Sequence, residues 1–116
     1  MKPGAMVILH LTNPTEKFWG VLEALQPAGV ILRGINIGSF DDWVTQAARQ
    51  ERQGGLGLVT MFVPLFRVER IFLDEDVGEV ESYRQRFQRR VGATVESYLG
   101  LPEDDTGEEE GWKMPS

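Results

Sequence analysis

Short runs of apolar residues alternate with polar turn residues through most of the chain, and helical spacing replaces this pattern in two places. The runs are rich in β-branched and aromatic residues, and clusters of Pro, Asn and Gly separate several of them. This pattern predicts five β-strands, over residues 7–12, 17–26, 30–37, 58–64 and 67–73. The first three strands are joined by short links, and we expect them to form a meander.

Two segments carry apolar residues at the three- and four-residue spacing of an amphipathic helix. The first, about residues 41–53, is inserted between the third and fourth strands. The second, about residues 77–99, follows the acidic triplet at 74–76. Carboxylates near a helix start complement its dipole. We therefore expect Asp41, Asp42 and the triplet to begin helices rather than to ligate a metal.

A glycine interrupts the second strand, directly after two aromatic residues. Gly20 packs no side chain and adds backbone entropy, so its place in a strand needs a reason. Five short strands fold into a compact sheet only with sharp bends, and glycine kinks are one way to bend a strand. We expect Gly20 to mark a bend, with Phe18, Leu22 and Leu25 inside it and Trp19 on the other face. The predicted fold is mainly β: a strongly bent, five-stranded small barrel with an inserted short helix and a C-terminal helix.

Charge and composition narrow the class of protein. The net charge of −6 is uneven, because residues 101–116 hold six acidic residues against Lys113. We expect this segment to be a disordered acidic tail and residues 1–100 to be one nearly neutral domain. No apolar run approaches the roughly 20 residues of a membrane helix, and no signal-peptide pattern begins the chain, so no membrane role and a cytoplasmic location are expected.

Candidate catalytic chemistry is sparse. The chain has no cysteine, which excludes disulfides and thiolate nucleophiles, and it has one histidine. His10 lies between two leucines on a short strand, so we expect it to point outward or into a subunit contact. We expect no enzyme activity, no cofactor and no metal. Trp43 on the inserted helix is expected to pack on the barrel, or alternatively to anchor a partner.

Two stretches resemble a known family. FWGVLEALQPAGVILRGIN resembles the first signature of Sm-like proteins, and FVPLFRVERIF resembles the second, so that the resemblance covers roughly residues 5–74. It implies a five-stranded small barrel that forms rings, in which strand four of one subunit pairs with strand five of the next, and that binds single-stranded RNA. The turn at 26–29 lacks the family's Asp and Asn, and Val63-Pro64 stands where the bacterial host-factor branch carries a Lys-His pair.

The resemblance suggests where RNA would bind. Gln26 lies at the turn after strand two, and Phe66 and Arg67 lie between strands four and five. Exposed aromatics and cations at such turns are what stacked bases and phosphates require. Arg86 and Arg90, in the most basic segment of the chain, are candidates for outer phosphate contacts. The alternatives are a core or subunit-contact role for Phe66, a solvated Arg67, and an arginine face that is solvated or holds the chain's own acidic tail.

Two functions of different classes follow. The first is a non-enzymatic Sm-like protein that binds single-stranded RNA as a homo-oligomer. The second is a protein-interaction or scaffold module on the same barrel, without RNA binding, whose protein partner the sequence does not identify. A small barrel of the SH3 type that forms no ring is a third reading of the same strand pattern.

Overall fold

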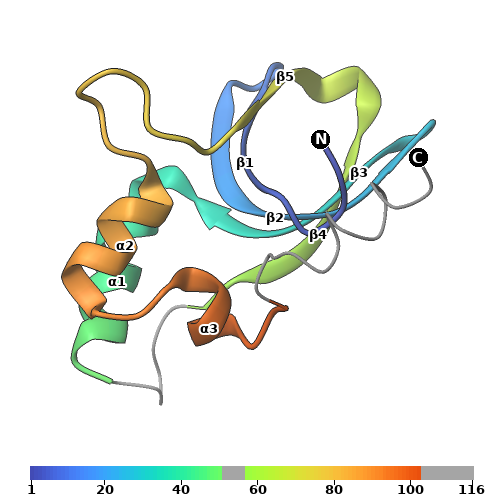
Figure 1. Cartoon of the computed structure of the whole chain (residues 1–116). Coiled ribbons are helices and arrows are strands. Elements are labelled where there is room, and N and C mark those ends of the chain that lie inside the picture. The colour runs from blue at the N-terminus through green and yellow to red at the C-terminus, as the bar shows by residue number, and fades with distance from the viewer. Residues whose placement is uncertain (51–56, 103–116) are drawn as a thin grey trace, which may run out of the picture.

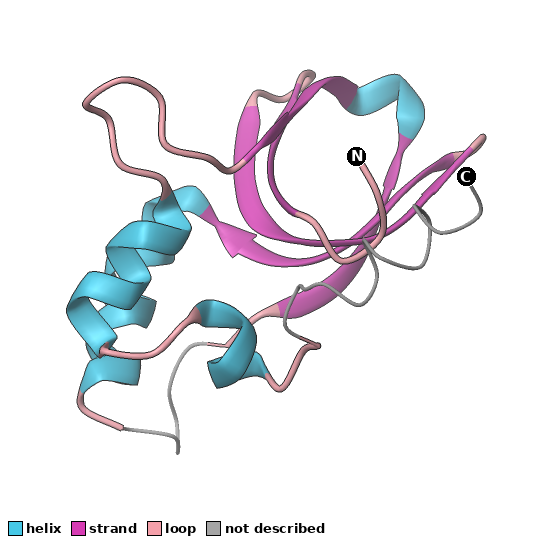
Figure 2. Ribbon diagram, viewed as in Figure 1, coloured by secondary structure: helices cyan, strands magenta, loops and turns pink. Residues whose placement is uncertain are grey.

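The computed structural model describes residues 1–50 and 57–102 and contains one antiparallel five-stranded sheet (Figures 1 and 2). Its strand order is β4-β3-β2-β1-β5. The strands are β1 (Met6–Leu11), β2 (Glu16–Gln26), β3 (Gly29–Asn36), β4 (Val59–Pro64) and β5 (Val68–Leu73). All five predicted strands are therefore confirmed, as is the mainly β class. The sheet is not closed into a barrel, because β4 and β5 are its two outer strands.

A close contact between two glycines lies in the β2–β3 pair. Gly20 and Gly34 are opposite each other in the register of the two strands. A Cβ atom on Gly20 would lie 2.3 Å from the carbonyl oxygen of Arg33, and one on Gly34 would lie 2.5 Å from that of Trp19. The strands thus approach too closely for any side chain, and β2 curves strongly along its length (Figure 1). This close approach gives the predicted role of Gly20 a physical basis.

Alternation along the strands produces two apolar cores, one on each face of the sheet. The inner core lies on the concave face, and its buried residues are Val7, Leu9, Leu11, Leu22, Val30, Leu32 and Val63. Phe18 packs against this core as predicted, whereas Leu25 is exposed near the end of the β2–β3 hairpin. The second core, on the opposite face, includes Trp19.

Three helices cover that second face: α1 (Phe40–Ala48), α2 (Tyr83–Val91) and α3 (Val95–Leu99) (Figure 1). The ring of Trp43 on α1 lies at their centre, with its centroid 5.6 Å from that of Trp19 and 5.1 Å from that of Phe87. Trp43 is buried, which confirms that it packs on the sheet. None of the helices in the described part of the chain combines the length and hydropathy of a membrane span.

The prediction of one helix over residues 77–99 is wrong. Val77 and Val80 instead form an isolated antiparallel bridge in a loop that projects between β5 and α2 (Figure 1). Gly92 then ends α2 in a left-handed conformation with φ of 90°, and the side chain of Thr94 caps α3. Left-handed backbone favours glycine and stops a helix, so the apolar spacing continues across two short helices rather than one.

The predicted bounds of the inserted helix and of the acidic tail are only partly tested. The inserted helix begins at Phe40 and ends at Ala48, so residues 49 and 50 of its predicted range are not helical, and residues 51–53 lie outside the described residues. Most of the predicted acidic tail, from residue 103 onward, also lies outside them.

Candidate interaction surfaces

Arg67 follows β4 in a short 3-10 helix, η2 (Leu65–Arg67). Its guanidinium donates hydrogen bonds to other residues of the chain. Its Nε donates to the carbonyl oxygen of Thr12 at 3.1 Å, and its Nη2 donates to that of Pro14 at 2.6 Å. The same Nη2 forms an ion pair with Glu16 at 3.1 Å. Arg67 therefore fixes the turn between β1 and β2, with its Nε and Nη2 already bonded inside the chain.

Phe66 has the opposite environment, with 84% of its surface exposed. Its helical turn is held on both sides, because the amide of Leu65 donates to Ala28 and the carbonyl of Arg67 accepts from Thr12. The first bond also joins η2 to the turn after β2, where Gln26 is exposed. The structure thus brings the turns of Gln26 and Phe66 together, whereas the Arg67 side chain faces the turn between β1 and β2.

Arg86 and Arg90 connect α2 to α1. The Nη1 of Arg86 lies 3.2 Å from Oδ1 of Asp41, and its guanidinium lies over the ring of Tyr83. Arg90 donates to the hydroxyl of Thr45 at 2.7 Å and lies 3.5 Å from the same Asp41 carboxylate. Both candidate phosphate contacts therefore have an acidic partner from the first turn of α1.

The two other arginines of α2 are paired as well. Arg84 lies 2.8 Å from Glu96, and Arg89 lies 2.7 Å from Glu81. The hydrogen bond from Arg89 lowers the pKa of the Glu81 carboxyl below its ordinary value. Partially exposed pairs of this kind contribute little stability, but they neutralise the basic face that the sequence indicates.

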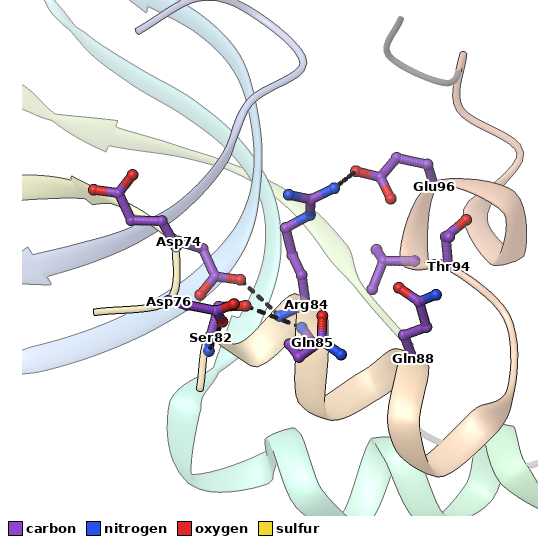
Figure 3. A pocket seen from close by; sticks show the side chains of 10 residues that line it. Asp74, Asp76, Ser82, Arg84, Gln85, Gln88, Thr94 and Glu96 are labelled. Atoms are coloured by element: carbon purple, nitrogen blue, oxygen red, sulfur yellow. Dashed lines mark hydrogen bonds and ion pairs between the residues drawn. The ribbon is translucent and has the colours of Figure 1, made fainter. Parts of the chain in front are cut away.

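Asp74 is the best-connected carboxylate at the start of α2, and it is only 5% exposed. It accepts hydrogen bonds from the Trp19 indole at 2.9 Å and from the amide of Tyr83 at 2.8 Å. It also accepts from the amide of Arg84 at 2.8 Å (Figure 3). Asp76 accepts from the amide of Ser82. Asp74 therefore accepts from the first amides of α2, as the helix-start role predicts, but Ser82 is the N-cap and α2 does not begin directly after the triplet. The Trp19 partner escaped sequence reasoning because 55 residues separate the two side chains.

A polar pocket of about 200 Å³ opens beside Asp74 (Figure 3). Its lining mixes carboxylates with the amides of Gln85 and Gln88 and the hydroxyl of Thr94. The Arg84–Glu96 ion pair spans one side of it. Within residues 1–50 and 57–102, no three potential ligand side chains are grouped in a way that would hold a metal ion.

His10 points away from the inner core, as its position between Leu9 and Leu11 predicts. Its ring meets that of Phe72 edge-on at a centroid distance of 4.9 Å, and the guanidinium carbon of Arg70 lies 5.9 Å from the centroid of the Phe72 ring. Burial, and then the positive charges of Lys17 and Arg70, lower the pKa of His10 below 6.5. The neutral imidazole is thus favoured on this outer face of β1 and β5.

Both edge strands expose apolar side chains. Val59 and Phe62 on β4 are 57% and 53% exposed, and Phe72 and Leu73 on β5 are 41% and 44% exposed. In the sheet of the described residues, each of these strands has a neighbour on one side only. Open edges of this kind pair readily with another strand, and natural proteins usually cover or charge them.

Neither a scan against protein-family models nor searches of curated proteins and of solved structures find a match to this chain. The turn at Phe66 can offer an aromatic ring, and the two edge strands can offer backbone hydrogen bonds together with apolar side chains.

Proposed function

We propose that this protein is a non-enzymatic interaction module that assembles with further copies of itself, with β4 of one copy pairing with β5 of the next. The observation that carries the proposal is the pair of open edges, each six residues long and each with exposed apolar side chains. The Sm-like resemblance of residues 5–74 implies the same pairing. The proposal includes the predicted small barrel, in which η2 connects β4 to β5.

An antiparallel pairing of the two edges also matches their faces. Met61 on β4 and Ile71 on β5 both pack against the inner core, so each marks the concave side of its strand. When Leu73 is placed opposite Val59 of the next copy, Ile71 falls opposite Met61. Every inner residue then meets an inner residue, as a continuous sheet requires.

The same register also pairs side chains on the face opposite the inner core. Arg70 falls opposite the exposed ring of Phe62, and Phe72 falls opposite Thr60. A cation beside an aromatic ring is favourable, and each cross-strand pair contributes roughly 0.2–1 kcal/mol. β5 has an extra residue at Glu69, because its register with β1 shifts there. This bulge brings Val68 opposite Val63, which keeps a further pair on the inner face.

Charge pairs at one position test the register. In Val59→Lys/Leu73→Lys, like charges face each other between copies, and we expect the assembly to dissociate. In Val59→Lys/Leu73→Glu, opposite charges occupy the same two positions, and we expect the assembly to return. Light scattering after size-exclusion chromatography measures the mass of each variant, and thermal unfolding verifies that each is folded. Equal masses for the two variants would refute this register.

Single-stranded RNA binding is the second candidate function, and the exposure of Phe66 beside the turn of Gln26 favours it. A base can stack on such a ring, and stacking contributes about 1–3 kcal/mol per base. The internal contacts of Arg67, Arg86 and Arg90 count against these three as phosphate ligands. Fluorescence anisotropy of A-rich and U-rich RNAs at two salt concentrations, with wild type and Phe66→Ala, tests this candidate.

A further inference from the structure

Phe66 is an exposed aromatic residue on a rigid support. The two flanking residues of η2 are fixed by backbone hydrogen bonds to Ala28 and Thr12, and the Arg67 side chain adds three contacts to the turn at 12–16. The ring is nevertheless 84% exposed, and the neighbouring Leu65 is 46% exposed. A large aromatic held in place by a rigid backbone is typical of the residues that dominate protein interfaces.

The position of η2 in the chain determines what Phe66 would meet in an assembly. η2 joins the end of β4 to the start of β5. When β4 of one copy runs antiparallel to β5 of the next, the end of the first strand lies beside the start of the second. Both of these strand ends continue into η2, one in each copy. The η2 helices of neighbouring copies are therefore brought together at the end of the paired strands.

We propose that Phe66 packs against η2 of the next copy, on its Leu65 and Phe66, and so forms a second contact of the assembly. This inference rests on the proposed pairing of β4 with β5. It explains why Leu65 and Phe66 stay exposed on a turn whose backbone is hydrogen-bonded to the rest of the chain. The paired strands supply backbone hydrogen bonds, and the η2 contact supplies the buried apolar anchor.

The absence of cysteine in the chain makes this contact directly testable. Leu65→Cys introduces one thiol at the proposed contact and keeps the ring of Phe66. Val80→Cys introduces one at an exposed position in the loop after β5, beyond the opposite end of that strand. With a short bis-maleimide reagent, we expect Leu65→Cys to give cross-linked dimers and Val80→Cys to give few. Equal yields from the two variants would overturn the inference.

Sedimentation velocity separates this inference from the proposed function. We expect Phe66→Ser to weaken assembly about tenfold or more, as an interface anchor does, and Phe66→Tyr to restore most of it. If wild type assembles and Phe66→Ser assembles equally well, the η2 contact is refuted while strand pairing stands. If Phe66→Ser keeps assembly but loses RNA binding, the ring belongs to an RNA site and the inference fails. If wild type is monomeric, the proposed strand pairing is refuted, and the η2 contact is refuted with it.

Discussion

The indole nitrogen of Trp19 donates a hydrogen bond of 2.9 Å to the buried carboxylate of Asp74. Trp19 lies on β2, and Asp74 directly follows β5 and accepts from the first two amides of α2. This contact connects the sheet to the helices that cover one of its faces. It therefore positions the loop after β5, next to one of the two strands through which copies are proposed to pair.

Replacement of Asp74 tests this connection. Asp74→Ala leaves three hydrogen-bond donors without their acceptor, and we expect it to lower the free energy of unfolding by roughly 3 kcal/mol. Asp74→Asn keeps one acceptor oxygen, so its loss should be smaller. Urea unfolding measures both, with Glu75→Ala as the control at the next, exposed position. A loss no larger for Asp74→Ala than for Glu75→Ala would contradict the structural role.

The glycine pair in β2 and β3 gives a second prediction. Gly20→Ala places a methyl group 2.3 Å from a backbone oxygen, which cannot move aside as a flexible side chain can. We expect destabilisation by about 3 kcal/mol. Gly57→Ala is the matched control, since among the described residues no atom beyond its chain neighbours lies within 4 Å of its added Cβ. If both variants melt at the same temperature, the two strands do not approach as closely as described.

Arg67 and Phe66 should differ sharply when each is changed to alanine. Arg67→Ala removes bonds to Thr12, Pro14 and Glu16, and we expect a loss of about 2 kcal/mol in stability. Phe66→Ala removes an exposed ring, so monomer stability should change by less than about 0.5 kcal/mol. Chemical unfolding at low protein concentration makes the comparison. A larger loss of stability for Phe66→Ala than for Arg67→Ala would contradict the internal role of Arg67.

His10 gives a prediction for pH. Its pKa is lowered by burial and by Lys17 and Arg70, so the protonated form is less favourable in the folded chain than in the unfolded chain. The contribution of His10 to stability is therefore complete above pH 6.5 and is lost as pH falls through the lower, folded pKa. NMR titration of this histidine should give a pKa below 6.5, and Arg70→Ala should raise it. A wild-type value at or above 6.5 would contradict this environment.

The local pattern was enough to predict the five strands, because alternation and turn residues are properties of neighbouring positions. It failed over residues 77–99, where apolar spacing continues through the helix stop at Gly92 and the new cap at Thr94. The site residues were harder to interpret. Arg67 and Arg86 are cations that sequence reasoning could assign to phosphates, but their actual partners come from positions 51–55 and 45 residues away. Such contacts depend on the fold and carry no local signal.

The mass of the wild-type protein in solution tests the central claim most directly. Sedimentation velocity over a wide range of protein concentration gives that mass without any substitution. Pairing of β4 with β5 of the next copy predicts a species whose mass is a multiple of 13.1 kDa and that dissociates on dilution or in the Val59→Lys/Leu73→Lys variant. A folded protein that sediments at 13.1 kDa at every concentration would contradict the account.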